Sequence, residues 1–401
     1  MTNVLVIGGG IGGLCLAQGL RRAGVDVTVY ERTHSRDDWL QGYRIHINPR
    51  GNEALRDCLA PENWQAFLRT VSHGESFAFV TEDLRDLLVL DPEFLGGDPD
   101  PAHQHYGVSR IKLREVLLTG LDGVVRHGKV FERYERTADG RVVAHFADGS
   151  SAVGDLLVGA DGANSRVRGQ LLPHARRLDT GVITIAGKYF HATGADLPPE
   201  LTARVNNVLP AGRGSLFTAV WRADDGGDYT LWGYADAAGQ FPGLDQLGGA
   251  ELRDLVHDKI GDWHPALRRL VAASDPDTVN AIRIRSATPV EPWPTGPVTL
   301  LGDAIHNMTP MAGIGANTAL RDASLLCRQL IAVRDGRAGL VPAVREYERQ
   351  MIDYGFAAVK QSLRNAKQAA NPRGRRVFRT VLRTAAAVPS LKRAMFGKIG
   401  Q

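Results

Sequence analysis

The sequence predicts an α/β protein in which a Rossmann-like domain carries a second domain of β-strands and a helical C-terminal extension. Three observations predict this class. The chain opens with a glycine-rich turn between an apolar strand and an amphipathic helix, two later apolar strands end in an aspartate beside a glycine, and the middle of the chain is rich in strand-forming residues. With 401 residues, the chain is also longer than one hydrophobic core usually serves.

The composition is that of an ordinary globular enzyme, with 43% hydrophobic and 23% charged residues. No stretch approaches the roughly 18 apolar residues that span a bilayer. The N-terminus lacks the pattern of an export signal, so the expected location is cytoplasmic. Cys15, Cys58 and Cys327 are scattered without Cys-x-x-Cys spacing. We therefore expect reduced thiols, and we predict no disulfide framework and no metal site.

The first 31 residues predict a dinucleotide-binding unit. A buried strand is followed by Gly8-x-Gly10-x-x-Gly13, which opens a helix, and a second strand ends at Glu31. Gly8 permits a tight turn, Gly10 lets the backbone approach a pyrophosphate, and Gly13 lets the helix lie close to the strand. The helix N-terminus attracts the phosphates. Glu31 falls where an acidic side chain accepts hydrogen bonds from an adenosine ribose.

Two later stretches have the same pattern as each other. An apolar strand at 156–158 leads into Asp161-Gly162, and another at 298–301 leads into Asp303. Because strand ends gather at the ligand edge of a parallel sheet, we expect these aspartates to lie at one site.

With these three stretches the chain resembles the flavin-dependent aromatic hydroxylases over about residues 1–365. These are the single-component class A FAD monooxygenases, typified by para-hydroxybenzoate and salicylate hydroxylases and the tetracycline-inactivating monooxygenases. The resemblance implies an FAD-binding domain in which Glu31 binds the ribose and Asp161-Gly162 lies near the flavin and the nicotinamide approach. Asp303 would bind the ribityl and pyrophosphate side. The segment "GVSRIKLREVL" resembles one that places an arginine against the flavin, which makes Arg110 a further candidate.

The segment after Asp303 is expected to hold the flavin ring. The chain turns through Pro310 to Gly315 and begins a helix near Asn317, so free N–H groups point into the turn. The N-terminus of this helix carries partial positive charge, which suits the anionic reduced flavin. Gly313 and Gly315 have no side chains, so the flavin ring can approach the backbone closely.

The reaction that the resemblance implies is a hydroxylation. NADPH or NADH reduces FAD, O2 forms a C4a-hydroperoxyflavin, and one oxygen atom passes to an aromatic or polycyclic secondary-metabolite substrate. No second G-x-G-x-x-G motif is present, so the nicotinamide cofactor is expected to bind transiently. Alkene epoxidation and Baeyer–Villiger oxygenation on the same scaffold remain open, as do a flavin-dependent reductase and a non-catalytic FAD-binding protein.

The strand-rich middle of the chain is expected to form the roof of the substrate pocket. In "DYTLWGYADA", Trp232 and Tyr234 share one face and the residues between them share the other. We assign an inner, pocket-facing set of aromatic residues, although an aromatic face on a sheet is more often core. The set is Phe190, Phe217, Trp221, Trp232 and Tyr234.

The stretch "QGYRIHINPRGNEAL" departs from the family pattern Gly-x-Gly-Ile-x-Leu-x-Pro-Asn. Arg44 replaces the second glycine, and His46 occupies the variable position. Arg44 could hold an acidic or phenolic substrate, bind an FAD phosphate or lie in solvent, and a flavin or substrate contact is favoured. For His46 a structural role is favoured. His306 follows Asp303 and is a weak candidate for a general base. No firm catalytic acid or base is assigned.

The C-terminal tail is strongly basic. It has no acidic residue after Asp353 and a charge of +11, which leaves −7 for the rest of the chain. A basic amphipathic helix is predicted from the spacing of Phe378, Val381, Leu382, Ala385 and Val388. Packing of its apolar face on the acidic body is favoured over peripheral membrane contact, and nucleic-acid binding is not expected.

The predicted boundaries divide the chain into three parts. The FAD-binding domain is discontinuous and comprises 1–73, 105–177 and 280–355. The substrate-binding domain comprises 74–104 and 178–279, and the basic helices comprise 356–401.

Overall fold

In the computed structural model, which describes residues 2–34, 43–72, 75–95, 99–222, 227–310, 313–370 and 372–397, two main sheets organise the chain. Within these residues, one sheet has five parallel strands in the order β18-β12-β1-β2-β8. The apolar residues of β1, β12 and β18 are buried, as is usual for a parallel sheet with both faces covered. The strands are β1 (Asn3–Ile7), β2 (Asp26–Tyr30), β8 (Val125–Arg126), β12 (Leu156–Gly159) and β18 (Val298–Leu300).

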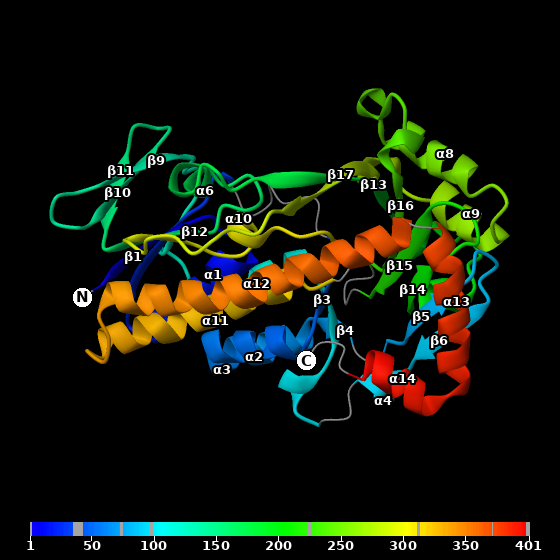
Figure 1. Ribbon diagram of the computed structural model, residues 1–401, viewed down its shortest axis with the longest axis horizontal. Coiled ribbons are helices and arrows are strands. Elements are labelled where there is room, and N and C mark those ends of the chain that lie inside the picture. Colours follow the sequence, from blue (N-terminus) through cyan, green and yellow to red (C-terminus); the bar gives the residue numbers. More distant parts are fainter. Residues whose placement is uncertain are drawn as a thin grey trace.

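Helices from distant parts of the chain pack on this parallel sheet. The glycine-rich helix α1 lies against the long α11, and α11 in turn lies against α2 and α12 (Figure 1). Their bounds are α1 (Ile11–Arg22), α2 (Pro49–Cys58), α3 (Pro61–Arg69), α5 (Arg110–Leu118), α6 (Arg166–Leu171), α10 (Asp303–His306), α11 (Gly315–Arg334) and α12 (Leu340–Ala370). Across the described ranges, no helix is both long enough and apolar enough to cross a membrane.

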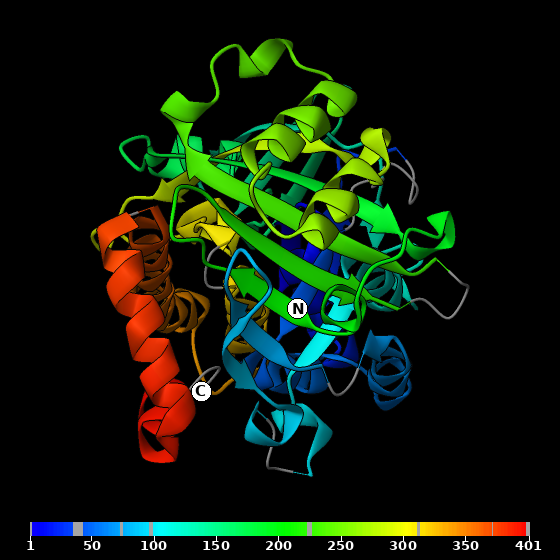
Figure 2. The same cartoon turned by 90° about the vertical axis from the view of Figure 1, so that its right-hand side faces the viewer.

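The second main sheet has seven described strands in the order β17-β13-β16-β15-β14-β5-β6. Two helices, α8 (Gly249–Lys259) and α9 (Pro265–Ala272), cover one of its faces, as Figure 2 shows. The sequence did not predict these helices. The strands are β5 (Phe77–Val80), β6 (Asp86–Leu90), β13 (Arg177–Phe190), β14 (Val205–Val208), β15 (Ser215–Trp221), β16 (Tyr229–Ala237) and β17 (Asn280–Ala287).

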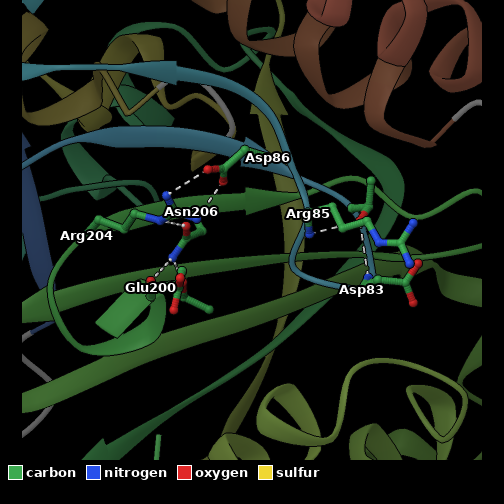
Figure 3. Close-up of polar contacts among 8 residues, drawn as sticks. Asp83, Arg85, Asp86, Glu200, Arg204 and Asn206 are labelled. Atoms are coloured by element: carbon green, nitrogen blue, oxygen red, sulfur yellow. Dashed lines mark hydrogen bonds and ion pairs between the residues drawn. The ribbon is translucent and has the colours of Figure 1, made fainter. Parts of the chain in front are cut away.

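Polar side chains tie β14 to the strands beside it (Figure 3). The guanidinium of Arg204 donates to Asp86 at 2.7 Å and to the side chain of Asn206 at 2.8 Å. The Asn206 amide donates to the Glu200 carbonyl and to the Thr218 hydroxyl. These contacts hold β14 in place between β5 and β15, where the sheet changes from antiparallel to parallel pairing.

Two small sheets complete the described chain. One contains β3 (Arg44–Ile47), β7 (Tyr106–Ser109) and β4 (Val71–Ser72), and it lies close to β15. The other is a hairpin extension of β9 (Phe131–Arg136), β10 (Val142–Phe146) and β11 (Ser151–Gly154). The short helices α4 (Pro92–Leu95) and α7 (Pro199–Thr202) lie in connections.

The C-terminal helices α13 (Pro372–Ala387) and α14 (Pro389–Phe396) pack on the body beside β6. Leu382 is fully buried, and the ring of Phe378 meets that of Phe79 edge-on at 5.9 Å between centroids. Arg375 is only 3% exposed and donates to the carbonyls of the turn before β15, while Arg379 pairs with Glu82 at 3.1 Å. Four of the five residues of the predicted apolar face are thus buried or half-buried against the protein, whereas Val388 is exposed.

Candidate functional site

The turn between β1 and α1 is shaped by close backbone approaches. Gly8 has a φ of +112°, and a Cβ atom there would lie 2.4 Å from the Ala160 carbonyl oxygen. A Cβ atom on Gly13 would lie 2.2 Å from the carbonyl oxygen of Gly8. At Gly10, by contrast, a Cβ would meet no atom within 4 Å. The helix N-terminus is thus pressed against the sheet, with open space where a phosphate would approach.

Glu31 is fixed beside this turn at the end of β2. The side chain is 4% exposed, and its carboxylate accepts the N–H groups of Gly9 at 2.6 Å and Thr33 at 2.9 Å. The two bonds fix the orientation of the carboxylate, and the bond from Gly9 holds it against the glycine turn. Such a carboxylate suits a ligand hydroxyl pair next to a pyrophosphate.

The turn after β12 holds a second carboxylate. Asp161 accepts the N–H groups of Arg166 at 2.8 Å and Val167 at 3.3 Å through Oδ2, and so caps α6. Its Oδ1 is buried and has no hydrogen-bond partner in the part of the chain that the structure describes. Burial raises the pKa of this carboxyl. A buried oxygen without a protein partner fits a ligand that donates a hydrogen bond.

The turn after β18 presents a third carboxylate. Gly302 caps α10 with a φ of +64°, and Asp303, the first residue of the helix, is exposed. Arg110 begins α5 directly after β7. Burial lowers the pKa of Arg110, and the nearby carboxylate of Asp303 opposes this shift. The two charges therefore face the same region from different elements.

Arg168 joins the turns that follow β12 and β18. Its guanidinium donates to the carbonyl of Ala304 at 2.7 Å and to that of Ala163 at 3.0 Å. The sequence alone indicated no role for Arg168. Because strands end side by side in a parallel sheet, one arginine can bridge two turns that lie far apart in the chain.

The turn before α11 is tied to β3 by Asn317. The side-chain oxygen accepts the N–H of Asn48 at 2.9 Å, and the amide donates to the His46 carbonyl at 2.9 Å. The side chain of Asn317, predicted to bind cofactor, is thus occupied by the protein. Gly313 has a φ of +63°, and α11 begins at Gly315. Residues 311–312 of this turn lie outside the described residues.

The proposal of His306 as a general base is wrong, because its side chain is fully buried in an ion pair. Its Nε2 lies 2.7 Å from Oδ2 of Asp322, which also accepts the Gly302 N–H, and the Tyr354 hydroxyl donates to Oδ1. Burial alone would lower the pKa of His306, but the carboxylate raises it above the ordinary value. No sequence pattern pointed to Asp322 or Tyr354, since α11 and α12 meet only in the fold.

The basic residues of β3 also have protein partners. The side chain of Arg44 is 6% exposed and pairs with Glu75, although its Nε has no partner among the described residues. Nε2 of His46 lies 3.0 Å from Nδ1 of His105. Burial lowers the pKa of His46 to about 3, with smaller contributions from the positive charges of His105 and Arg44. His46 is therefore neutral at physiological pH, in keeping with the structural role that the sequence favoured.

The predicted aromatic residues of the roof divide between the two faces of the seven-stranded sheet. The inner-face assignment is wrong for Trp232 and Tyr234, which pack in the core under α8 and α9. Trp232 is fully buried and donates through Nε1 to the Ser274 hydroxyl at 2.7 Å. Phe190, Phe217 and Trp221 lie on the opposite face, because strand neighbours alternate.

Three further residues that the sequence reasoning missed lie on this opposite face. Tyr43, next to β3, packs with Trp221 and Tyr229. The Lys188 Nζ lies 4.8 Å from the centre of the Tyr229 ring and 5.6 Å from that of Tyr43. Burial lowers the pKa of Lys188. The alternation in "GKYF" could have identified Lys188, because it shares a face with Phe190.

The fold and the three glycine turns define a class of protein, namely flavoproteins with a Rossmann-like nucleotide fold. The family model for the FAD binding domain matches residues 125–361, and that for the NAD(P)-binding Rossmann-like domain matches residues 6–35. The chain belongs to this FAD-binding family. Its cofactor is FAD, and the open glycine turn and the buried unpartnered carboxylate oxygen both fit that dinucleotide.

Relatives of the chain are named as FAD-dependent monooxygenases. It is 32% identical to an FAD-dependent urate hydroxylase from Klebsiella pneumoniae, over 88% of this chain and 86% of the relative. It is also 32% identical to the dual O-methyltransferase/FAD-dependent monooxygenase elcB of Phaeosphaeria nodorum, covering 80% of this chain. The chain spans only 39% of elcB and 44% of the two similar CTB3 proteins from Cercospora species.

Solved structures of the same kind superpose on this fold. A candidate FAD-containing monooxygenase from Photorhabdus luminescens has a TM-score of 0.84 at 40% identity, covering 92% of this chain and 99% of that one. HpxO from Klebsiella pneumoniae, complexed with FAD and uric acid, has a TM-score of 0.80 at 24% identity, covering 98% and 95%. The second likeness concerns the fold alone.

Proposed function

We propose that the protein is an FAD-dependent monooxygenase that uses NAD(P)H and O2 to hydroxylate an aromatic or polycyclic secondary-metabolite substrate. The observation that carries this proposal is the meeting of three glycine turns at the carboxyl ends of β1, β12 and β18, opposite a sheet face that bears aromatic side chains. When bound, FAD supplies hydride acceptance from the nicotinamide cofactor and, once reduced, reaction with O2.

Each turn would hold a different part of the cofactor. Gly8, Gly10 and Gly13 would admit the pyrophosphate at the N-terminus of α1, and Glu31 would accept hydrogen bonds from the adenosine ribose. Asp303, which is exposed and close to Arg110, would bind the ribityl side.

The flavin ring would lie between two turns. Asp161 and Gly162 would flank it on one side. Gly313, Gly315 and the N–H groups of the first turn of α11, including that of Asn317, would face it on the other. This helix N-terminus would stabilise negative charge on the reduced ring.

The substrate would lie between the flavin and the inner face of the seven-stranded sheet. Phe190, Phe217 and Trp221 would provide an apolar wall, with Phe217 being 38% exposed. Tyr229 and Tyr43 extend this wall toward β3. A wall of this kind excludes water from the reaction, which protects the oxygen-transferring state. No residue is proposed as an acid or a base.

The test begins with the absorbance of the purified protein. Bound flavin is expected, together with NADPH or NADH oxidation and oxygen uptake that rise with one member of a panel of phenolic, indolic and polyketide compounds. The product should gain one oxygen atom from labelled O2. A saturated product formed without oxygen would identify a reductase instead, and failure to bind FAD would overturn the proposal.

A further inference from the structure

The inner face of the seven-stranded sheet lies opposite the face that α8 and α9 cover (Figure 2). Two large apolar side chains on this inner face stay open to solvent, since Phe217 is 38% exposed and Ile282 is 42% exposed. Phe217 stands opposite Gly233, Gly233 stands opposite Ala186, and Ile282 stands opposite Thr184. Directly opposite residues share a face, so small residues form a floor between two apolar walls. Such a floor fits a planar ring.

A buried lysine stands at one end of this floor. Lys188 is on the same face of β13 as Ala186, two residues further on, which is about 7 Å along a strand. Lys188 is only 9% exposed, and its Nζ lies over the rings of Tyr229 and Tyr43. Aromatic faces stabilise a cation at such distances. The fold thus holds a positive charge beside the apolar part of the face.

Two further hydrogen-bond donors lie in the same cluster. The Tyr229 hydroxyl approaches the backbone of Arg44, but it forms no regular hydrogen bond to any residue that the structure describes. The Nε of Arg44 is likewise buried without a partner in the described ranges, although its guanidinium pairs with Glu75. Buried donors are almost always bonded in native proteins, so these two point to a bound group that accepts hydrogen bonds.

An acidic oxygen has the chemistry that these groups require. A carboxylate or phenolate oxygen accepts several hydrogen bonds, and those from a charged donor are the strongest. Burial lowers the pKa of Lys188, and a negative charge beside the ammonium group would offset this cost. The charge of Arg44 is already balanced by Glu75. Lys188 is therefore the residue expected to set a preference for a charged ligand.

We propose that Lys188, together with the Tyr229 hydroxyl, binds an acidic oxygen of the substrate, either a carboxylate or an ionised phenol or enol. The planar body of the substrate would lie over Gly233 and Ala186. The proposal rests on the proposed function and names the class of its substrate, a planar aromatic compound that bears an acidic group. Lys188 acts in specificity and takes no part in oxygen transfer.

The experiment measures binding of planar two-ring probes to the FAD-loaded protein by calorimetry. The acid 2-naphthoate is compared with the uncharged 2-naphthamide, and 2-naphthol is compared with 2-methylnaphthalene. A preference within the first pair identifies a carboxylate site, and one within the second pair identifies a phenol site. We expect at least one preference of roughly 10-fold or more, as is usual for hydrogen bonds to a charged group.

Lys188→Met is the main test variant, because it removes the charge and keeps the length of the side chain. It should abolish the preference and leave binding of the uncharged probes nearly unchanged. Lys259→Met is the matched control, since the Lys259 Nζ also lies over an aromatic ring, that of Phe241 at 5.0 Å, on the helix-covered side of the sheet. This control should keep the wild-type preference. FAD content and thermal unfolding report whether each variant folds.

Tyr229→Phe is the second test variant, and it decides the outcome if Lys188→Met loses FAD. It should reduce the preference without changing the affinity for the uncharged probes. An unchanged preference in the folded test variants would overturn the proposal, as would a wild-type protein that shows no preference or binds none of the probes. A protein that prefers the acidic probe but never takes up oxygen with NADPH or NADH would support this site and count against the monooxygenase proposal.

Discussion

At the scale of single residues, three carboxylates at the ends of parallel strands have different environments. Glu31 is buried and bonded to backbone N–H groups, Asp161 caps a helix through one oxygen, and Asp303 is exposed. All three follow strands of the five-stranded parallel sheet. The environments of the three carboxylates differ because a different turn follows each strand. The conformation of that turn decides whether backbone N–H groups lie within hydrogen-bond distance of the carboxylate or leave it open to a ligand.

We expect Gly13→Ala to destabilise the protein and to abolish FAD binding. Its Cβ would lie 2.2 Å from the Gly8 carbonyl oxygen, and this backbone cannot move without displacing α1 from β1. A cost of about 1–3 kcal/mol is typical of such overpacking. Thermal unfolding and the ratio of flavin to protein absorbance measure the two effects.

Two alanine variants serve as controls for this prediction. Gly10→Ala meets no protein atom within 4 Å, so it should retain the stability of the apoprotein and lose FAD affinity only. Gly169→Ala on α6 also meets no atom and should change neither property. Wild-type FAD binding by Gly13→Ala would contradict the proposed role of this turn.

The His306–Asp322 pair should make stability depend on pH. Because the pKa of His306 is raised in the folded protein, the pair stabilises fully below the unfolded value of about 6.5 and loses this contribution as pH rises through the folded pKa. Asp322→Asn should remove that part of the pH dependence. Denaturant unfolding from pH 5.5 to 9 measures it.

The control for this pair is Glu53→Gln, which breaks an exposed contact with His103 at 3.4 Å. This variant should keep the wild-type profile, since exposed pairs contribute little. Identical pH profiles for Asp322→Asn and the wild type would show that the buried pair does not titrate with folding.

At the scale of elements, β16 shows why an aromatic strand does not reveal its pocket face. Trp232 and Tyr234 alternate with Leu231 and Gly233, so the sequence fixes which residues share a face. The sequence does not show which of the two faces of β16 packs against helices. The helices α8 and α9 cover the face with the larger side chains and leave the other face toward β3.

Substitutions on the two faces of this sheet should separate stability from substrate binding. Trp232→Ala should cost about 3–5 kcal/mol, because it leaves a cavity under α8 and α9. Phe217→Ala, on the opposite face, should change stability by less than about 1 kcal/mol and raise KM for the substrate. Denaturant unfolding and steady-state kinetics test the pair, and equal destabilisation by both would contradict the assignment of faces.

The C-terminal helix α13 should depend on one buried arginine. Arg375 donates to the carbonyls of Gly212 at 2.9 Å and Gly214 at 2.5 Å, so Arg375→Ala removes both bonds and takes this donor from the buried Gly214 contact. A loss of about 1.5–3 kcal/mol is expected from hydrogen bonds to a charged group. Arg383→Ala removes an exposed arginine from the same helix and should change stability little. Denaturant unfolding compares them, and equal effects would contradict this role.

At the scale of the whole molecule, the proposed flavin site draws on segments from nearly every part of the chain. The turns after β1, β12 and β18 meet at one sheet edge, and Asn317 ties β3 to the start of α11. A ligand bound at such a site would contact segments that lie far apart in the chain and that only the folded chain brings together. The folded state should therefore be strongly linked to FAD.

Removal of FAD should lower the unfolding temperature of the whole chain. With free FAD at 100 times its dissociation constant, binding stabilises the folded state by about 2.7 kcal/mol. Calorimetric scans of apoprotein with increasing FAD should show a continuous rise in Tm. A Tm that does not change with added FAD would contradict the proposal that FAD binding stabilises the folded state.

The sequence by itself determined the class of fold, the cofactor and the order of the glycine turns. These features are local, because a strand, a tight turn and a helix with fixed spacing need no distant partner to be recognised. Positions 8 and 13 require glycine because of contacts with the first βα unit and with the neighbouring strand. The apolar strands before Asp161 and Asp303 can be recognised directly in the sequence.

Only the tertiary structure decided which of the candidate side chains face a ligand. His306 and Asn317 belong to motif stretches, yet both are bonded to groups far away in the chain, and Trp232 points away from the pocket. Burial, pairing and charge at these positions depend on which elements pack together, and that is set by the whole fold.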